Sequence, residues 1–205
     1  MNIVKILPTI IVDQIAAGEV IEGPFSVVKE LIENSIDAGS KSISIAIDNG
    51  GVDKIHIADD GCGMSPDDLK NAFKRHATSK ITNINDLDHI GTLGFRGEAL
   101  PSIASVSQVK AFSVYGNNAS EGVEVIIHGG ELLKEKNKVG NQGTSIEVLN
   151  LFYNIPARKK FLKTENTEKR KIIKLVKEYS IGNPDISFSL NSNKKEILKL
   201  RASNL

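Results

Sequence analysis

Three polar residues, Glu30, Asn34 and Asp37, follow one another at steps of four and three within a strongly periodic segment. These steps stack side chains on one face of a helix. A carboxylate one turn away from a carboxamide can accept a proton from a water molecule, while the amide oxygen can bind a hard cation. The alternative is an ordinary amphipathic helix with a solvated polar face, and the segment alone leaves both interpretations open.

A second group surrounds Asp59, which ends a predicted strand and is followed by Gly61 and Gly63. Two glycines let a backbone approach a flat ligand closely. A carboxylate held there can accept a hydrogen bond from an exocyclic amine such as that of adenine. A plain Asp–Gly turn before a helix is the alternative, and the motif by itself favours the turn. Thr144 begins another predicted strand and would place a hydroxyl near Asp59 if the two strands are neighbours.

A third group lies on a long glycine-containing segment over residues 76–97. Residues 94–97 (Gly94-Phe95-Arg96-Gly97) directly precede a helix, where free N–H groups and the helix dipole form an anion site. Arg96 either contacts phosphate or holds the loop through a salt bridge. Residues 78–80 (Thr78-Ser79-Lys80) add two hydroxyls and a cation, unless they merely cap a helix end. Long segments of this kind inside a compact domain are commonly functional loops or lids.

Hydrophobic periodicity predicts the elements that position these groups. An apolar stripe (Val27, Val28, Leu31, Ile32, Ile36) predicts one long helix that begins near Pro24 and stops at Gly39. Helices are also predicted over 98–105, 156–163 and 165–180 and after the N-cap Ser65, with strands over 42–47, 54–58, 109–115, 121–128, 144–149, 186–190 and 196–200. Residues 131–142 are interpreted as a mobile charged hairpin. The order predicts an α+β fold: a mostly antiparallel mixed sheet with helices on one face.

Composition sets broad limits on function. The chain has 205 residues, of which 40% are hydrophobic, and this composition fits one globular domain. Its net charge of +1 does not by itself indicate nucleic acid as a partner. The single Cys62 excludes an internal disulfide framework and is interpreted as a small packing residue. We expect no membrane span and a cytoplasmic protein, or a nuclear one in a eukaryote. The stretch 158–177 holds nine Lys or Arg and two acids; it is either a weak DNA-binding surface or, more commonly for such runs, a solvated helix face.

The sequence of these segments resembles the N-terminal ATPase region of the MutL DNA mismatch repair proteins, which belong to the superfamily that includes gyrase, Hsp90 and histidine kinases. The resemblance covers nearly the whole chain. Asp-x-Gly-x-Gly is shared across the superfamily, whereas Ala-Thr-Ser-Lys, Gly-Phe-Arg-Gly-Glu-Ala-Leu and Phe-Tyr-Asn-x-Pro-Ala-Arg together are specific to MutL-like proteins. These segments stand here at 77–80, 94–100 and 152–158.

The resemblance implies a Bergerat-type ATPase sandwich that binds ATP and Mg²⁺ and hydrolyses ATP slowly. It implies that Glu30 is the general base for the attacking water, that Asn34 is the Mg²⁺ ligand, and that Asp59 contacts adenine. The remaining nucleotide-binding residues that it implies are Asp37, Gly61, Gly63, Ala77, Thr78, Ser79, Lys80, Leu93, Gly94, Phe95, Arg96, Gly97 and Thr144.

The resemblance also implies an organisation and partners. Residues 1–205 are expected to form the ATPase domain, with the family's transducer and C-terminal dimerisation domains outside this chain. The transducer supplies a lysine to the γ-phosphate, so ATP binding is a safer expectation for this chain than hydrolysis. ATP is expected to order the lid and to pair two subunits through the N-terminal region, with a mismatch-recognition protein of the MutS type as partner. Gly23, Asp60 and Ile155 depart from the residues common in the family, and none is an implied ligand.

Two other classes of function remain open at this point. One is a nucleic-acid-binding module with a vestigial pocket, for which the basic stretch 158–177 is the supporting feature. The other is a chaperone or histidine kinase of the same superfamily. The segment Phe152-Tyr153-Asn154-Ile155-Pro156-Ala157-Arg158 argues against both of the latter.

Overall fold

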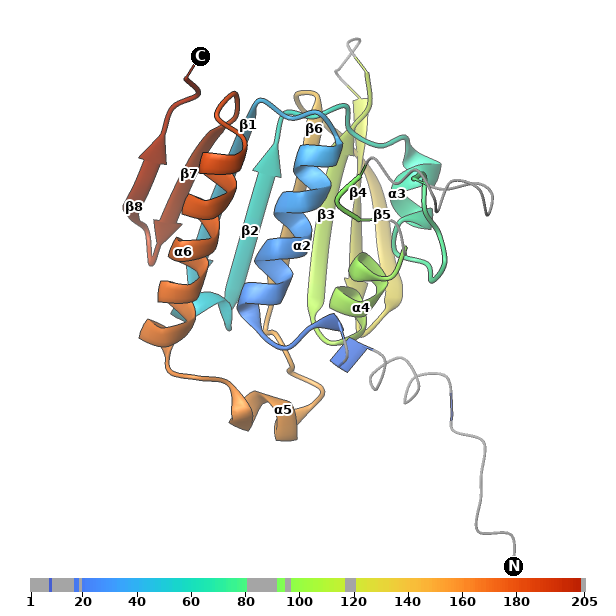
Figure 1. Cartoon of the computed structure of the whole chain (residues 1–205). Helices are drawn as coiled ribbons and strands as arrows, with labels where there is room; N and C mark the ends of the chain where they lie inside the picture. The colour runs from blue at the N-terminus through green and yellow to red at the C-terminus, as the bar shows by residue number, and fades with distance from the viewer. Residues whose placement is uncertain are drawn as a thin grey trace, which may run out of the picture.

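The chain folds into an eight-stranded sheet with helices on one face (Figure 1). The structure is a computed structural model, and it describes residues 8, 17–18, 20–80, 92–94, 97–116 and 121–203. The strand order is β5-β4-β3-β6-β2-β1-β7-β8. Among the described strands, neighbours run antiparallel except β1 and β7, which run parallel. The predicted α+β class, with a mostly antiparallel mixed sheet, is confirmed.

The elements follow the predicted periodicities closely. The helices are α2 (Pro24–Asp37), α3 (Pro66–Asn71), α4 (Ala99–Ser105), α5 (Pro156–Phe161) and α6 (Glu165–Gly182), with a short 3-10 turn η1 (Asn49–Gly51). The strands are β1 (Ser42–Asp48), β2 (Lys54–Asp59), β3 (Gln108–Val114), β4 (Glu121–His128), β5 (Glu131–Val139), β6 (Gly143–Leu149), β7 (Ser187–Ser192) and β8 (Lys195–Leu200).

Helix α2 is fixed by the stripe that its sequence predicted. Val27, Val28, Leu31 and Ile32 are fully or almost fully buried against the sheet, and burying each such side chain stabilises the fold by about 1.5–3 kcal/mol. Pro24 occupies the first turn, and Gly39 follows the helix with φ of +74°, a conformation that glycine adopts without strain. Figure 1 shows α2 and α6 side by side across the same face of the sheet.

The opposite face of the sheet carries polar and charged side chains in place of helices. Its side chains alternate with the buried ones along β1, β2 and β3. His56 lies on this face and pairs with the Ser145 hydroxyl at 2.9 Å. Burial lowers the pKa of His56, so the ring stays neutral near neutral pH and serves as a hydrogen-bonding group.

Two local expectations were wrong. Residues 131–139 form the regular edge strand β5, which pairs with β4 over its length, because backbone pairing can order a strand that has no buried face. Cys62 is exposed rather than packed. No described helix is long and apolar enough to cross a membrane.

Candidate functional site

A cavity of about 1320 Å³ lies beside the polar face of α2. It is bounded by α2, the segments that follow β2 and α3, the start of α4 and the beginning of β6. The predicted site residues that line it are Glu30, Asn34, Asp37, Asp59, Gly63, Ala77, Thr78, Ser79, Lys80, Leu93, Gly94, Gly97 and Thr144. Gly61 lies outside the lining, and Phe95 and Arg96 are outside the described residues.

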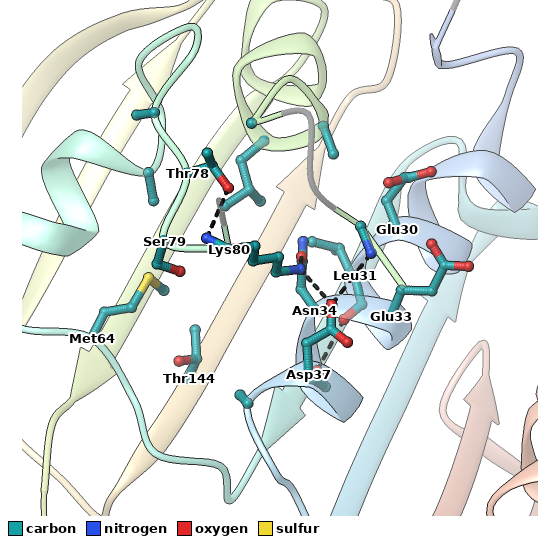
Figure 2. A pocket seen from close by; sticks show the side chains of 18 of the residues that line it. Glu30, Leu31, Glu33, Asn34, Asp37, Met64, Thr78, Ser79, Lys80 and Thr144 are labelled. Carbon is teal, nitrogen blue, oxygen red and sulfur yellow. Dashed lines mark hydrogen bonds and ion pairs between the residues drawn. The ribbon is translucent and has the colours of Figure 1, made fainter. Parts of the chain in front are cut away.

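The polar face of α2 meets the lid segment through Lys80. The Lys80 ammonium donates to Asn34 Oδ1 at 3.0 Å and to Asp37 Oδ2 at 2.5 Å. Figure 2 shows Lys80 reaching across the cavity toward Asn34 and Asp37, while Glu30 and Glu33 lie farther along α2. The Asn34 carboxamide oxygen therefore faces the cavity, where the Lys80 ammonium contacts it.

Asp37 gathers donors from both described parts of the lid. Besides Lys80, the backbone N–H groups of Leu93 and Gly94 donate to its two carboxylate oxygens at 3.0 and 3.4 Å. A carboxylate in the last turn of a helix opposes the negative end of the helix dipole. These three donors offset that cost, so Asp37 holds residues 80 and 93–94 against α2.

Asp59 lies between α2 and the sheet, where its carboxylate accepts hydrogen bonds from three elements. Oδ1 accepts from the Gly61 N–H at 2.9 Å and from the Thr144 N–H at 3.3 Å, and the Ser35 hydroxyl lies 3.0 Å from Oδ2. Burial raises the pKa of Asp59, and these hydrogen bonds only partly oppose the rise. The carboxylate is thus held in place by neutral donors, with no cation contacting it among the described residues.

The expected proximity of Thr144 to Asp59 is confirmed, but through a different atom. Strands β2 and β6 pair with Asp59 opposite Thr144, and the backbone N–H of Thr144 reaches the carboxylate. The Thr144 hydroxyl instead pairs with the Ser113 hydroxyl at 2.9 Å.

Two glycines are required by close backbone approach. Gly63 has φ of +71°, and a Cβ there would lie 1.8 Å from the carbonyl oxygen of Val114. Gly97 has φ of +63°, and its Cβ would lie 2.5 Å from the carbonyl oxygen of Ala77. Any side chain at these positions would force the segments around the cavity apart.

Sequence reasoning missed Ser35 and Ser113. Ser35 is buried, with its hydroxyl 2.9 Å from the Leu31 carbonyl and close to Asp59. Its position one turn after Leu31 places a hydroxyl in the apolar stripe, which is a detectable signal for a buried hydrogen bond. Ser113 shares the buried side of β3 with Val109 and Ala111 and also accepts from the Met64 N–H at 2.8 Å.

Residues 21–143 match the family described as histidine kinase-, DNA gyrase B- and HSP90-like ATPase. The chain belongs to this ATPase family, and its sheet and covering helices are the corresponding fold.

Within that family, the relatives that match nearly the whole chain are MutL proteins. The chain is 52% identical over 200 residues to the DNA mismatch repair protein MutL of Thermodesulfovibrio yellowstonii, covering 98% of this chain and 36% of the relative. It is 53% identical over 198 residues to the protein of the same name from Clostridium perfringens strain 13, covering 97% of this chain and 29% of the relative. The predicted MutL resemblance is confirmed, and the chain spans about a third of the length of these relatives.

A solved structure agrees with this assignment. The Aquifex aeolicus MutL ATPase domain complexed with ADP matches with a TM-score of 0.76 and 37% identity, over 91% of this chain and 66% of that one.

Proposed function

We propose that the chain is an ATP-binding domain that uses Mg²⁺ and hydrolyses ATP slowly, with Glu30 as its general base. The observation that carries the proposal is that one cavity collects Asp59, Asn34, Glu30 and the lid residues around Lys80. The ATPase family of the chain and the ADP complexed with its structural neighbour from Aquifex aeolicus support the same function.

Asp59 is the proposed contact for the exocyclic amine of adenine. Its carboxylate is oriented by the N–H groups of Gly61 and Thr144, and it has lone pairs left to accept another hydrogen bond. The absence of a contacting cation among its described neighbours leaves this acceptor strong. Gly63 allows the backbone to lie close enough to contact a flat base.

Asn34 is the proposed protein ligand of Mg²⁺. Hard oxygen donors suit this ion, and Mg²⁺ usually keeps several waters and shares phosphate oxygens. No cluster of three or more His, Cys, Asp or Glu that could hold a metal occurs in the described part of the chain, which is consistent with an ion held jointly by Asn34 and the triphosphate. Bound there, Mg²⁺ would supply charge neutralisation on the phosphates.

For hydrolysis, the Glu30 carboxylate would take a proton from water as the water oxygen bonds to the γ-phosphorus and ADP leaves. Lys80 and the backbone N–H groups of Leu93 and Gly94 are the proposed phosphate donors. In this structure they contact Asp37, so Asp37 is proposed to exchange these donors with phosphate and thereby couple nucleotide binding to lid order.

The biological role is proposed from the MutL relatives. Residues 1–205 would form the ATPase domain of a longer mismatch repair protein, whose ATP-ordered N-terminal region pairs two subunits and whose partner is a MutS-type mismatch-recognition protein. Three exposed lysines of α5 and α6, Lys159, Lys160 and Lys177, would add weak, salt-dependent DNA binding. A cytoplasmic location remains a prediction.

The decisive experiment is equilibrium binding of a non-hydrolysable ATP analogue, with and without Mg²⁺. We expect saturable binding that Mg²⁺ strengthens, and loss of that Mg²⁺ effect in Asn34→Ala. Glu30→Gln should bind as the unmodified chain does and hydrolyse ATP at least about 100-fold more slowly. No saturable binding, or unchanged hydrolysis in Glu30→Gln, would refute the proposal.

A further inference from the structure

Lys29 lies between two carboxylates of α2. Its ammonium is 2.8 Å from Glu33 Oε2 and 3.3 Å from Glu30 Oε1. Within the part of the chain that the structure describes, Lys29 is the side chain that hydrogen-bonds Glu30. The orientation of the proposed general base therefore depends on a neighbour one residue before it.

The Lys29–Glu33 pair differs from an ordinary i,i+4 pair on a helix surface. Exposed pairs of this spacing contribute only about 0.3–0.5 kcal/mol because both side chains remain mobile and hydrated. Glu33, however, is 8% exposed. Burial lowers the pKa of Lys29, but the hydrogen bond to Glu33 and the nearby carboxylates outweigh it, so the pKa is raised overall. Lys29 thus remains charged beside Glu30.

Glu33 is itself fixed from a second helix. Its other oxygen, Oε1, accepts the hydroxyl proton of Tyr179 at 2.5 Å, and Tyr179 lies on α6. Burial and the contact with Glu33 raise the pKa of Tyr179, so this hydroxyl keeps its proton and remains a donor. Both oxygens of Glu33 are engaged, and Lys29 is held by a carboxylate that cannot rotate freely.

We propose that Lys29 is a positioning residue for Glu30, anchored through Glu33 to Tyr179 of α6. The inference rests on the proposed role of Glu30 as general base. In the hydrolytic step, Glu30 takes the proton of water, and Lys29 keeps all of its own protons. Lys29 restricts the Glu30 carboxylate to one orientation at the cavity wall.

The test compares variants of Lys29 in nucleotide affinity and in single-turnover hydrolysis of ATP. Lys29→Met should slow hydrolysis about 10- to 100-fold, because small displacements of a catalytic group cost up to about 100-fold. The dissociation constant for a non-hydrolysable ATP analogue should change by less than about twofold. Lys29→Arg should recover most of the rate, and Tyr179→Phe should slow hydrolysis by a smaller factor, since it removes only the anchor of Glu33.

Lys174→Met is the matched control. Lys174 forms an i,i+4 pair with Glu178 at 3.7 Å on the outer side of α6, where both side chains are largely exposed. The Lys174–Glu178 pair has the same spacing and the same charges as the Lys29–Glu33 pair, but neither of its residues lines the cavity. Its removal should leave both affinity and rate unchanged.

Several outcomes would overturn the inference. An unaltered rate in Lys29→Met would do so, as would a loss of affinity at an unaltered rate, which would make Lys29 a phosphate contact. An equal loss of rate in Lys29→Met and Lys174→Met would also contradict it, because the loss would then not come from releasing Glu30. A failure of the proposed function is recognised separately, by the absence of nucleotide binding in the unmodified chain.

Discussion

Asp59 and Glu124 are carboxylates on opposite faces of the same sheet, and the fold shifts their pKa values in opposite directions. Glu124, on the face without helices, is 1% exposed and is surrounded by the ammonium groups of Lys136, Lys138 and Lys110 at 2.9, 3.0 and 3.6 Å. Burial disfavours its charged form, but these lysines outweigh burial and lower the pKa of Glu124 to about 2. Asp59 has only neutral donors, and burial raises its pKa.

The difference separates a stabilising carboxylate from one that we propose binds a ligand. The charge of Glu124 is already compensated inside the chain, so it contributes to stability and has little left to offer a ligand. The charge of Asp59 is oriented but not neutralised, so it costs folding free energy that a bound donor can recover. Such uncompensated groups are typical of binding sites, where stability is lost in favour of function.

The largest expected effect is on nucleotide binding in Asp59→Asn. The amide oxygen can still accept from Gly61 and Thr144, and the new NH₂ can donate to the Ser35 hydroxyl, which in turn can donate to the Leu31 carbonyl. The fold is therefore satisfied, while an amide donor now opposes the adenine amine. We expect affinity to fall at least about 1000-fold, as measured by calorimetry.

Thermal unfolding of Asp59→Asn supplies the control. Because the folded pKa of Asp59 is raised above 3.8, its ionisation lowers stability as the pH rises through that value. Removing the charge should leave stability at neutral pH unchanged or raised. A variant that loses stability and affinity together would break the distinction between the two carboxylates.

A second prediction concerns the backbone beside Asp59. Gly63→Ala should destabilise the fold by about 3 kcal/mol or more, because its Cβ would overlap the Val114 carbonyl oxygen. Gly39→Ala is the matched control, since Gly39 has nearly the same φ but nothing within 4 Å of its Cβ. We expect Gly39→Ala to cost about 1 kcal/mol, the conformational part alone. Equal losses in denaturant unfolding would show that conformation, and not close approach, requires Gly63.

Glu124→Gln should show the reverse of the Asp59 behaviour. We expect a loss of about 2 kcal/mol in unfolding free energy at pH 7, with unchanged nucleotide affinity. Since the pKa of Glu124 is lowered from 4.5 to about 2, its contribution is complete above pH 4.5 and is lost as the pH falls toward 2. The variant should therefore lose less stability than the unmodified chain over that interval in acid titrations followed by circular dichroism.

The sequence predicted those features that depend on local patterns. Three of these are encoded within a few residues: the stripe of α2, the strands β1 and β2, and the Ser65 cap. The Ser65 hydroxyl accepts from the Asp68 N–H at 3.2 Å. The adjacency of Asp59 and Thr144 was open in the sequence, because alternation identifies a strand without naming its neighbour.

Features built by distant segments were beyond sequence patterns. The parallel pairing of β1 with β7 joins residues more than 140 positions apart. Strand β5 has no buried face, so no apolar alternation marks it. Asp37 was predicted as a nucleotide contact from resemblance alone. Its contacts with Lys80, Leu93 and Gly94 join residues 43 to 57 positions apart, which no local pattern indicates.

The smallest expected effects come from removing single lysines around Glu124, and they test whether its compensation is shared. Lys138 contacts Oε2 at 3.0 Å and lies 4.6 Å from the centre of the Phe112 ring, whereas Lys110 is 3.6 Å from Oε2. Lys138→Met should cost about 1 kcal/mol and Lys110→Met about 0.3 kcal/mol, since about half of each side chain is exposed to solvent that screens the interaction. Both losses should shrink in high salt, and nucleotide affinity should not change. If either variant lost as much unfolding free energy as Glu124→Gln, a single lysine would stabilise the charge of Glu124, and the stabilisation would not be shared.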